Sequence, residues 1–248
     1  MMAMGFELVV LVAAVLAGAI AAISGFGIGS VLTPLLATQM ETKLAVAAVS
    51  IPHLVATAVR FVSLRKHLDR RVFWNFGLLS AAGGLAGALL NTYAASRALT
   101  IVFGCLLLLA GVTGLTQFWS RMRFGRPVAW IAGAASGLFG GLVGNQGGIR
   151  SAALLGFDVP KEAYVATATA IALIVDGARM PVYLATQTHA LGRFWPAITI
   201  ACAGVLVGTW FGMRGLRAMP ERTFRTSVSL LIAALGVYMV LKGWGVVP

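Results

Sequence analysis

Charged residues are scarce in this chain of 248 residues. They make up 10% of the sequence, and only 7 residues are acidic, whereas a soluble domain has roughly 25% charged residues. Hydrophobic residues make up 59%, and they form uncharged runs such as 8–40, 72–96 and 98–120. About 20 such residues cross a bilayer as a helix. The composition excludes a soluble domain and predicts an all-α polytopic membrane protein.

Residues for enzyme chemistry are also few. The sequence has two cysteines and three histidines. Cys105 and Cys202 lie inside apolar runs without metal-ligand spacing, which is typical of packing residues. Paired carboxylates at a useful spacing, a nucleophile elbow and a phosphate-binding loop are all missing from the sequence. We therefore expect no enzymatic activity, no metal site and no cofactor.

Basic residues outnumber acidic residues by 19 to 7, which gives a formal net charge of +12. Most of the arginines fall in short segments between the apolar runs, where basic residues set the orientation of membrane helices. The basic balance is thus interpreted as a topology signal, and we expect membrane lipid rather than nucleic acid as a partner.

The chain contains an internal duplication. Residues at a constant spacing of 119 are identical at many positions, for example Gly25 and Gly144 or Arg60 and Arg179. A fixed period of this kind indicates repeated structural units. We interpret residues 1–120 and 127–248 as two homologous transmembrane repeats within a single membrane domain.

Each repeat is predicted to contain a helix, a Gly-rich break, a short apolar stretch and three fuller helices. The pairs Gly83/Gly87 and Gly204/Gly208 in these later helices have the small-xxx-small spacing that lets helix backbones approach closely in lipid. The predicted ranges are 7–24, 31–38, 44–63, 72–93 and 99–119 in the first repeat, and 127–143, 151–157, 163–184, 194–213 and 223–242 in the second.

Loop charges predict that the two repeats are inverted. The strongly basic loops, 65–71 and 214–225, follow different helices of their repeats. If basic loops face the cytoplasm, equivalent loops lie on opposite sides, and inversion needs an odd number of crossings per repeat. This gives ten crossings if each broken segment spans the bilayer together with its short helix. The alternative is eight full spans plus two short re-entrant segments.

The Gly-rich breaks "SGFGIGS" and "GLVGNQGGIRS" occur at equivalent positions of the two repeats. Non-helical backbone at membrane depth is tolerated only inside protein or beside a water-filled cavity, and paired interruptions indicate a transporter's binding site near the midplane. Helix N-termini after the breaks favour anions. The alternative is that the glycines serve only helix packing. The candidate substrate-binding residues are Gly25, Gly27, Gly29, Ser30, Thr33, Gly144, Asn145, Gln146, Gly147, Gly148, Arg150 and Ser151.

Four further polar residues lie in the apolar runs. Asp176 and Arg179 share one helix face, either as a structural ion pair or as a proton carrier beside an anion pathway. Arg60 is the repeat mate of Arg179, and His53 is either a core residue or a proton relay. These four are the candidates for coupling or gating. Arg150 either binds an anion through its guanidinium group or extends to an interface.

The stretches "GFGIGSVLTPLLATQMETKLAVAAVS" and "GLVGNQGGIRSAALLGFDVPKEAYVATATA" resemble the two repeat signatures of the sulfite exporter TauE/SafE family. The resemblance implies a carrier for sulfite, sulfoacetate or related organosulfonates in the bacterial inner membrane, usually an exporter. The departures at Ser30, Asn145, Gln146 and Ala153 leave the choice of anion open. The matching signature positions are Gly25, Gly27, Gly29 and Pro34 in the first repeat and Gly144, Gly147, Gly148 and Thr167 in the second.

Residues and resemblance together predict a secondary transporter that works by alternating access around a midplane anion site. The expected partner is a small organic or inorganic sulfur anion, with its carbon tail against Phe26, Phe139 or Tyr183, and a homodimer is an option. An anion channel and a membrane accessory protein without transport activity are the alternatives.

Overall fold

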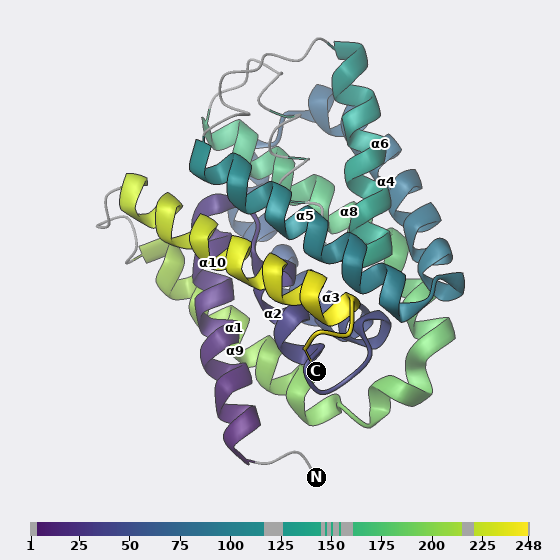
Figure 1. Ribbon diagram of the computed structural model, residues 1–248. Coiled ribbons are helices and arrows are strands. Elements are labelled where there is room, and N and C mark those ends of the chain that lie inside the picture. The colour runs from purple at the N-terminus through teal and green to yellow at the C-terminus, as the bar shows by residue number, and fades with distance from the viewer. Residues whose placement is uncertain are drawn as a thin grey trace.

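The uncharged runs of the sequence form helices. The computed structural model describes residues 4–116, 126–144, 147, 150, 154, 161–214 and 221–247. Every regular element in these ranges is a helix (Figure 1), which confirms the all-α prediction. The elements are α1 (Met4–Ser24), α2 (Ile28–Leu36), α3 (Thr42–Leu64), the 3₁₀ turn η1 (Arg65–His67), α4 (Arg70–Tyr93), α5 (Ser96–Thr116), α6 (Arg126–Val143), α8 (Lys161–Gly192), α9 (Trp195–Arg214) and α10 (Glu221–Gly243).

Seven of these helices are long and apolar enough to cross a membrane, namely α1, α3, α4, α5, α8, α9 and α10. In α6, the apolar segment that the structure describes is shorter, Trp130–Val143. Large apolar side chains such as Leu8, Leu78 and Ile131 are exposed at 61%, 57% and 72%. Such a surface suits lipid rather than water. The chain is therefore a multi-pass membrane protein.

Several helix boundaries differ from those predicted. α1, α2 and α5 each begin three residues earlier than predicted, and α2 starts directly after Gly27 of the first break. α8 continues eight residues beyond the predicted end at residue 184. The polar extension is accommodated because Gln187 is buried and donates through Nε2 to Asn91 Oδ1 at 3.4 Å. Of the second predicted short helix, 151–157, the structure describes only Leu154, which is helical.

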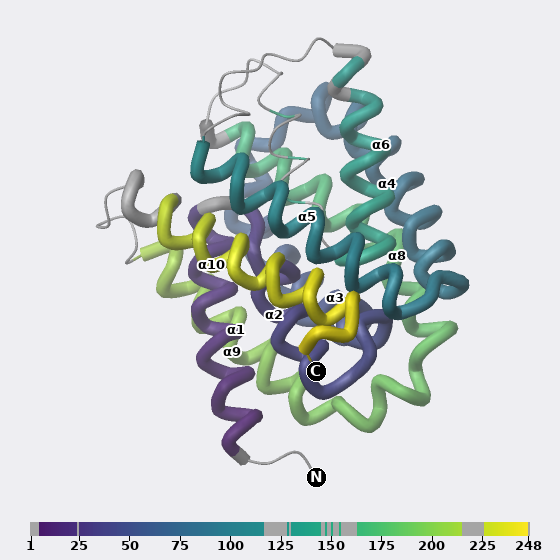
Figure 2. Tube along the Cα trace, viewed as in Figure 1, coloured from purple at the N-terminus to yellow at the C-terminus, as the bar shows by residue number. Residues whose placement is uncertain are grey.

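The main helix pairs join one predicted repeat to the other. α1 packs along α9, α4 along α6, and α5 along α10, while α3 and α8 meet between them. Figures 1 and 2 show α5 and α10 side by side across one face of the molecule. Neither half therefore buries its helices by itself.

Glycines allow the backbones of these pairs to approach each other. A Cβ atom at Gly83 or Gly87 of α4 would collide with backbone atoms of α6, and one at Gly208 of α9 would collide with the backbone of α1. At Gly204 it would meet the Ala14 side chain and the backbone of α1. The predicted small-xxx-small contacts are confirmed.

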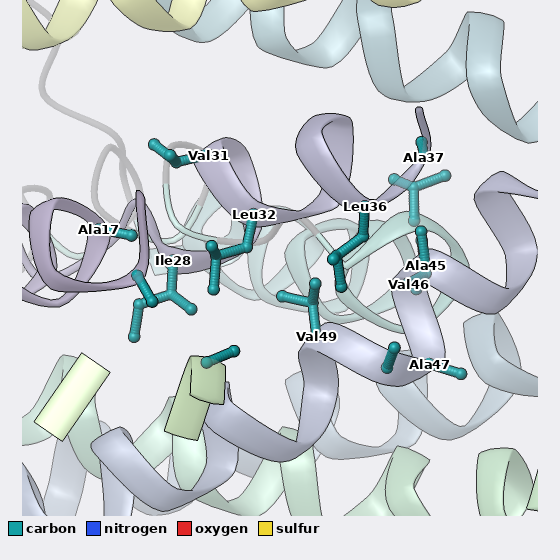
Figure 3. Packing of buried hydrophobic residues seen from close by; sticks show 14 of the residues in the cluster. Ala17, Ile28, Val31, Leu32, Leu36, Ala37, Ala45, Val46, Ala47 and Val49 are labelled. Atoms are coloured by element: carbon teal, nitrogen blue, oxygen red, sulfur yellow. The ribbon is translucent and has the colours of Figure 1, made fainter. Parts of the chain in front are cut away.

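The short helix α2 is held by α3. Eight of its nine residues are buried, and its apolar side chains belong to the same core cluster as those of α3. In Figure 3, Leu36 of α2 and Val49 of α3 point toward each other, and Ile28 lies beside α1 near Ala17. This packing fixes the position of the first turn of α2, where the candidate site begins.

Candidate functional site

In the structure, both breaks begin with a glycine in the left-handed conformation. α1 ends at Ser24, and Gly25 follows with a φ of 79°. α6 ends at Val143, and Gly144 follows with a φ of 76°. Residues with a Cβ atom seldom adopt this conformation, which commonly ends a helix. The two helices thus end in the same way at positions 119 residues apart in the sequence.

An arginine binds a carbonyl in the last turn of each of these helices. Arg60 of α3 donates through Nη1 to the Ala21 carbonyl of α1. Arg179 of α8 donates through Nη1 to the Gly140 carbonyl of α6 at 2.6 Å. The carbonyl end of a helix carries partial negative charge, so a cation there is favourable. Arg60 and Arg179, two of the predicted coupling or gating candidates, therefore contact the ends of the broken helices.

The first turn of α2 faces the first break. Gly27 precedes the helix with a φ of 130°, and no side chain caps the helix. The leading N–H groups of a helix have no partner within the helix, and they carry partial positive charge. Ser30 and Thr33 on this helix are buried, and Thr33 Oγ1 has no hydrogen-bond partner among the described residues.

The two breaks lie against each other. Gly29 of α2 packs so closely on the Gly144 carbonyl that a Cβ atom would overlap it, and Gly147 packs in the same way on Phe26. Both glycines therefore serve close packing, which is the alternative role that was predicted for the break glycines from the sequence. The first and second Gly-rich stretches form one region of the molecule.

Arg150 joins the two breaks. Its side chain is buried, with an exposed fraction of 1% for the residue, and its Nη2 donates to the Gly25 carbonyl at 3.1 Å. Its Nε and Nη1 have no hydrogen-bond partner among the described residues. Arg150 thus lies in the interior and not at a surface, and two of its donor atoms remain unused, which is costly for a buried group.

A pocket opens where these groups meet. Six of the predicted substrate-binding residues line it, together with Phe26 and His53. Gly25 borders the pocket through its bond to Arg150, and Thr33 Oγ1 lies near Gly144. The six lining residues that the sequence predicted are Gly27, Gly29, Ser30, Gly144, Gly147 and Arg150.

His53 connects the pocket to a buried ion pair. Its Nδ1 lies 2.6 Å from Asp176 Oδ2. The other carboxylate oxygen, Oδ1, lies 2.7 Å from Arg179 Nη2. The predicted intrahelical pair of Asp176 and Arg179 is therefore present. The contact with His53 is an additional one, and it joins α3 to α8.

The interior around the pocket has an excess of positive charge. Among the described residues, the buried charged side chains are Arg60, Arg150, Arg179 and Asp176, with exposed fractions of 2% or less. One carboxylate thus faces three guanidinium groups. Buried charges are stable only when they are paired, so a small anion would balance this site.

Some predicted residues lie elsewhere. Asn145, Gln146, Gly148 and Ser151 are outside the described residues. Thr167 accepts a hydrogen bond from the Asp69 backbone N–H at 3.0 Å, beside the first turn of α4. Phe139 and Tyr183 are absent from the described lining of the pocket. In the part of the chain that the structure describes, no three His, Cys, Asp or Glu residues are grouped as metal ligands would be.

Sequence reasoning missed the role of Tyr183. Its hydroxyl group donates to the Gly141 carbonyl at the end of α6, and its ring lies 5.9 Å from the Arg179 guanidinium carbon. The link from His53 to Asp176 was missed as well, because 123 residues separate the partners. The available signal was the presence of polar residues inside apolar runs, which does not identify their partners.

The comparisons with known proteins give one family. The model of the family described as "Sulfite exporter TauE/SafE" matches residues 10–239. No curated protein and no solved structure matches the chain. The family match covers both Gly-rich breaks and all or most of each helix that packs around them. The chain therefore belongs to the sulfite exporter TauE/SafE family.

Proposed function

We propose that the chain is a secondary transporter that exports small sulfur-containing anions across the bacterial inner membrane. The family description names sulfite, and we extend the proposed class to sulfoacetate and related organosulfonates because of the resemblance of the Gly-rich stretches to the family signatures. The observation that carries the proposal is Arg150, a buried guanidinium group with unused donors that lines a pocket between two broken helices. A buried charge at membrane depth marks a functional site by default.

The pocket offers donors of the kinds that an oxyanion needs. Arg150 Nε and Nη1 have no partner among the described residues, and a guanidinium group forms charge-assisted hydrogen bonds to oxyanions such as sulfite or a sulfonate. The uncapped first turn of α2 adds backbone N–H groups and the positive end of a helix dipole. Ser30 contributes a hydroxyl group. Asn145, Gln146, Gly148 and Ser151 remain sequence-based candidates for the same site.

We infer that the two halves are homologous repeats related by inversion. Support comes from contacts that recur at the sequence spacing of 119. Arg60 binds Ala21 and Arg179 binds Gly140, while Gly25 and Gly144 both end a helix with positive φ. The helix pairs α1–α9 and α4–α6 are equivalent to each other, because each pairs the first helix of one repeat with the fourth helix of the other.

We propose alternating access as the transport cycle. The contacts that join the halves at the pocket include the Arg150 bond to Gly25 and the His53 bond to Asp176, beside the close packing of Gly29 on Gly144 and of Gly147 on Phe26. The bonds of Arg60 and Arg179 to the helix ends stay within one half each. An anion on the unused donors of Arg150 would attach to the same side chain that bonds the Gly25 carbonyl, so ligand binding would bias the contact between the halves. Rocking of one half against the other would then expose the site to either side.

The proposal is tested with purified protein in liposomes. We expect saturable sulfite efflux that is stimulated by sulfite on the opposite side. Replacing Arg150 by Gln removes charge-assisted hydrogen bonds to the ligand and should lower anion affinity by at least about tenfold. The control is Arg193→Gln, because Arg193 is exposed and lies outside the pocket lining.

Three outcomes contradict the proposal in different ways. Flux and affinity in Arg150→Gln equal to those of the unmodified protein would exclude the assigned site. Conductance without stimulation by substrate on the opposite side would indicate an anion channel. Neither flux nor anion binding would indicate an accessory protein.

A further inference from the structure

His53 is the only histidine of the three in the sequence that lines the described pocket. His67 and His189 are exposed. Nδ1 of His53 is bound to Asp176, so its second ring nitrogen, Nε2, remains for a ligand or a proton. The hydrogen bond at one ring nitrogen determines which nitrogen carries the proton in the neutral ring. With Nδ1 donating to the carboxylate, Nε2 is the nitrogen that accepts a proton.

Asp176 is fixed from its other side. Arg179 binds Asp176 Oδ1 with one terminal nitrogen and the Gly140 carbonyl with the other. The negative charge of Asp176 is therefore balanced by Arg179 and does not change when an anion enters the pocket. Of the groups in this chain of contacts, His53 is the one whose side-chain type changes its charge near neutral pH when unperturbed.

The charged groups facing His53 come from three places. Asp176 and Arg179 belong to α8, Arg60 to its own helix α3, and Arg150 to the pocket wall. With the pocket empty these groups carry a net charge of two positives, which opposes a third on His53. An anion on Arg150 removes part of this excess and favours protonation of His53.

The other elements packed on α3 bring no further charge to His53. The helix α2 contains no ionisable residue. On α5, Arg97 donates to the Gly243 carbonyl, and on α9, Arg214 stacks over the Trp210 ring. The residues of η1 are exposed. These residues are Arg65, Lys66 and His67.

We propose that His53 is the proton-binding group of the transporter and that it binds a proton together with the anion in the Arg150 pocket. This inference rests on the proposed function. The proton comes from water and forms one N–H bond at Nε2, and Asp176 acts as a positioning residue that holds the ring. Since coupling between two ligands is reciprocal, the proton must raise the affinity for the anion as much as the anion raises that for the proton.

The test measures proton uptake on anion binding by the purified protein in weakly buffered detergent solution. Methanesulfonate is the probe, because its own charge does not change near neutral pH. We expect the uptake of up to about one proton per bound anion. The affinity for methanesulfonate should fall by as much as about tenfold for each unit by which the pH rises on the alkaline side. In His53→Gln the uptake should vanish and the affinity should become independent of pH.

Two controls separate His53 from the rest of the protein. The variant His67→Gln/His189→Gln keeps His53 as its single histidine and should keep the full proton uptake. In the same variant, the NMR signal of the one labelled histidine should move toward its protonated position when methanesulfonate is added at constant pH. This measurement does not depend on whether His53→Gln folds.

Asp176→Asn should shift the pH range of proton uptake, because the amide no longer holds the ring by a charged contact. A purely structural role of Asp176 would change stability without moving this range.

Anion binding without proton uptake, or equal uptake in His53→Gln, would overturn the inference while the proposed function stands. An NMR signal of His53 that does not shift when methanesulfonate is added would also overturn the inference. If the unmodified protein bound neither methanesulfonate nor sulfite, the proposed function would fail first.

Discussion

The three buried arginines have three different surroundings. Arg60 binds the last turn of α1. Arg179 binds the last turn of α6 and the Asp176 carboxylate. Arg150 donates to the Gly25 carbonyl, and two of its donor atoms have no partner among the described residues. Arg60 and Arg179 thus stabilise helix ends, while Arg150 is the one of the three that lines the described pocket, where its unused donors could bind a ligand.

Removal of Arg179 should destabilise the protein. Arg179→Met leaves the Asp176 carboxylate buried without its closest guanidinium group and the Gly140 carbonyl without a charged donor, which should cost about 3 kcal/mol. The double variant Asp176→Asn/Arg179→Met removes both charges and should recover part of the loss. Thermal unfolding in detergent measures both, with the exposed Arg193→Met as control. A single variant as stable as the unmodified protein would contradict this account of the pair.

The Tyr183 hydroxyl group should matter more than that of an exposed tyrosine. Tyr183→Phe removes the hydrogen bond to the Gly141 carbonyl and should cost about 1 kcal/mol. Tyr93 is 88% exposed, so Tyr93→Phe is the matched control and should have almost no effect. Equal unfolding temperatures for the two variants would mean that the Gly141 bond does not contribute to stability.

At the scale of the elements, glycine controls how closely helices pack. The pairs α1–α9 and α4–α6 contain glycines from both partners, for example Gly18 facing α9 and Gly141 facing α4. Lipid is as apolar as the side chains, so the hydrophobic effect does not drive such pairs together in a membrane. They are held instead by dispersion contacts between the backbones and by lipid entropy.

Two glycine substitutions should have opposite effects. Gly87→Ala places a Cβ atom against the backbone of α6 and should destabilise the protein by more than about 1 kcal/mol, in spite of the better helix propensity of alanine. Gly177 lies in α8 and is exposed, and a Cβ atom added there would have no neighbour within 4 Å among the described residues. Gly177→Ala should therefore stabilise by up to about 1 kcal/mol. The unfolding temperatures of the two variants test this prediction. A change of the same sign in both variants would contradict it.

Helix composition predicted most of the elements, because long apolar runs have few alternatives in a membrane. The errors are informative. The start of α2 was predicted too late, since the glycines of the break also belong to the first turn, and α8 was predicted too short, since Gln187 and its neighbours have the composition of a loop. A local sequence pattern cannot predict the tertiary hydrogen bond that keeps such polar residues in a helix.

For the whole molecule, the sequence predicted the class and the family but only part of the site. Membership of a transporter family confirms that the chain is not an enzyme. The meeting of Gly29 with Gly144, and of Arg150 with Gly25, follows the predicted pairing of the breaks. The contact of His53 with Asp176 depends on the packing of α3 against α8, which no sequence pattern encodes. The homodimer, the inversion and the number of crossings stay predictions.

The pairing of helices across the halves predicts that a split protein assembles. Residues 1–120 and 121–248, expressed together as separate chains, should copurify through a tag on either half. The reason is that α1 packs on α9 and α6 packs on α4, while each broken helix keeps its arginine contact within its own half. Copurification followed by sulfite flux measures the outcome. Either half expressed without the other is the control, and halves that fail to associate would contradict the pairing.

The excess of buried guanidinium groups also has a consequence for the membrane potential. A charge that crosses the full membrane potential changes in energy by about 2.3 kcal/mol per 100 mV. A monovalent anion that binds together with a proton on His53 leaves the net charge of the site unchanged, whereas an anion that binds alone lowers it by one charge. The voltage dependence of the flux would thus distinguish the two modes of binding.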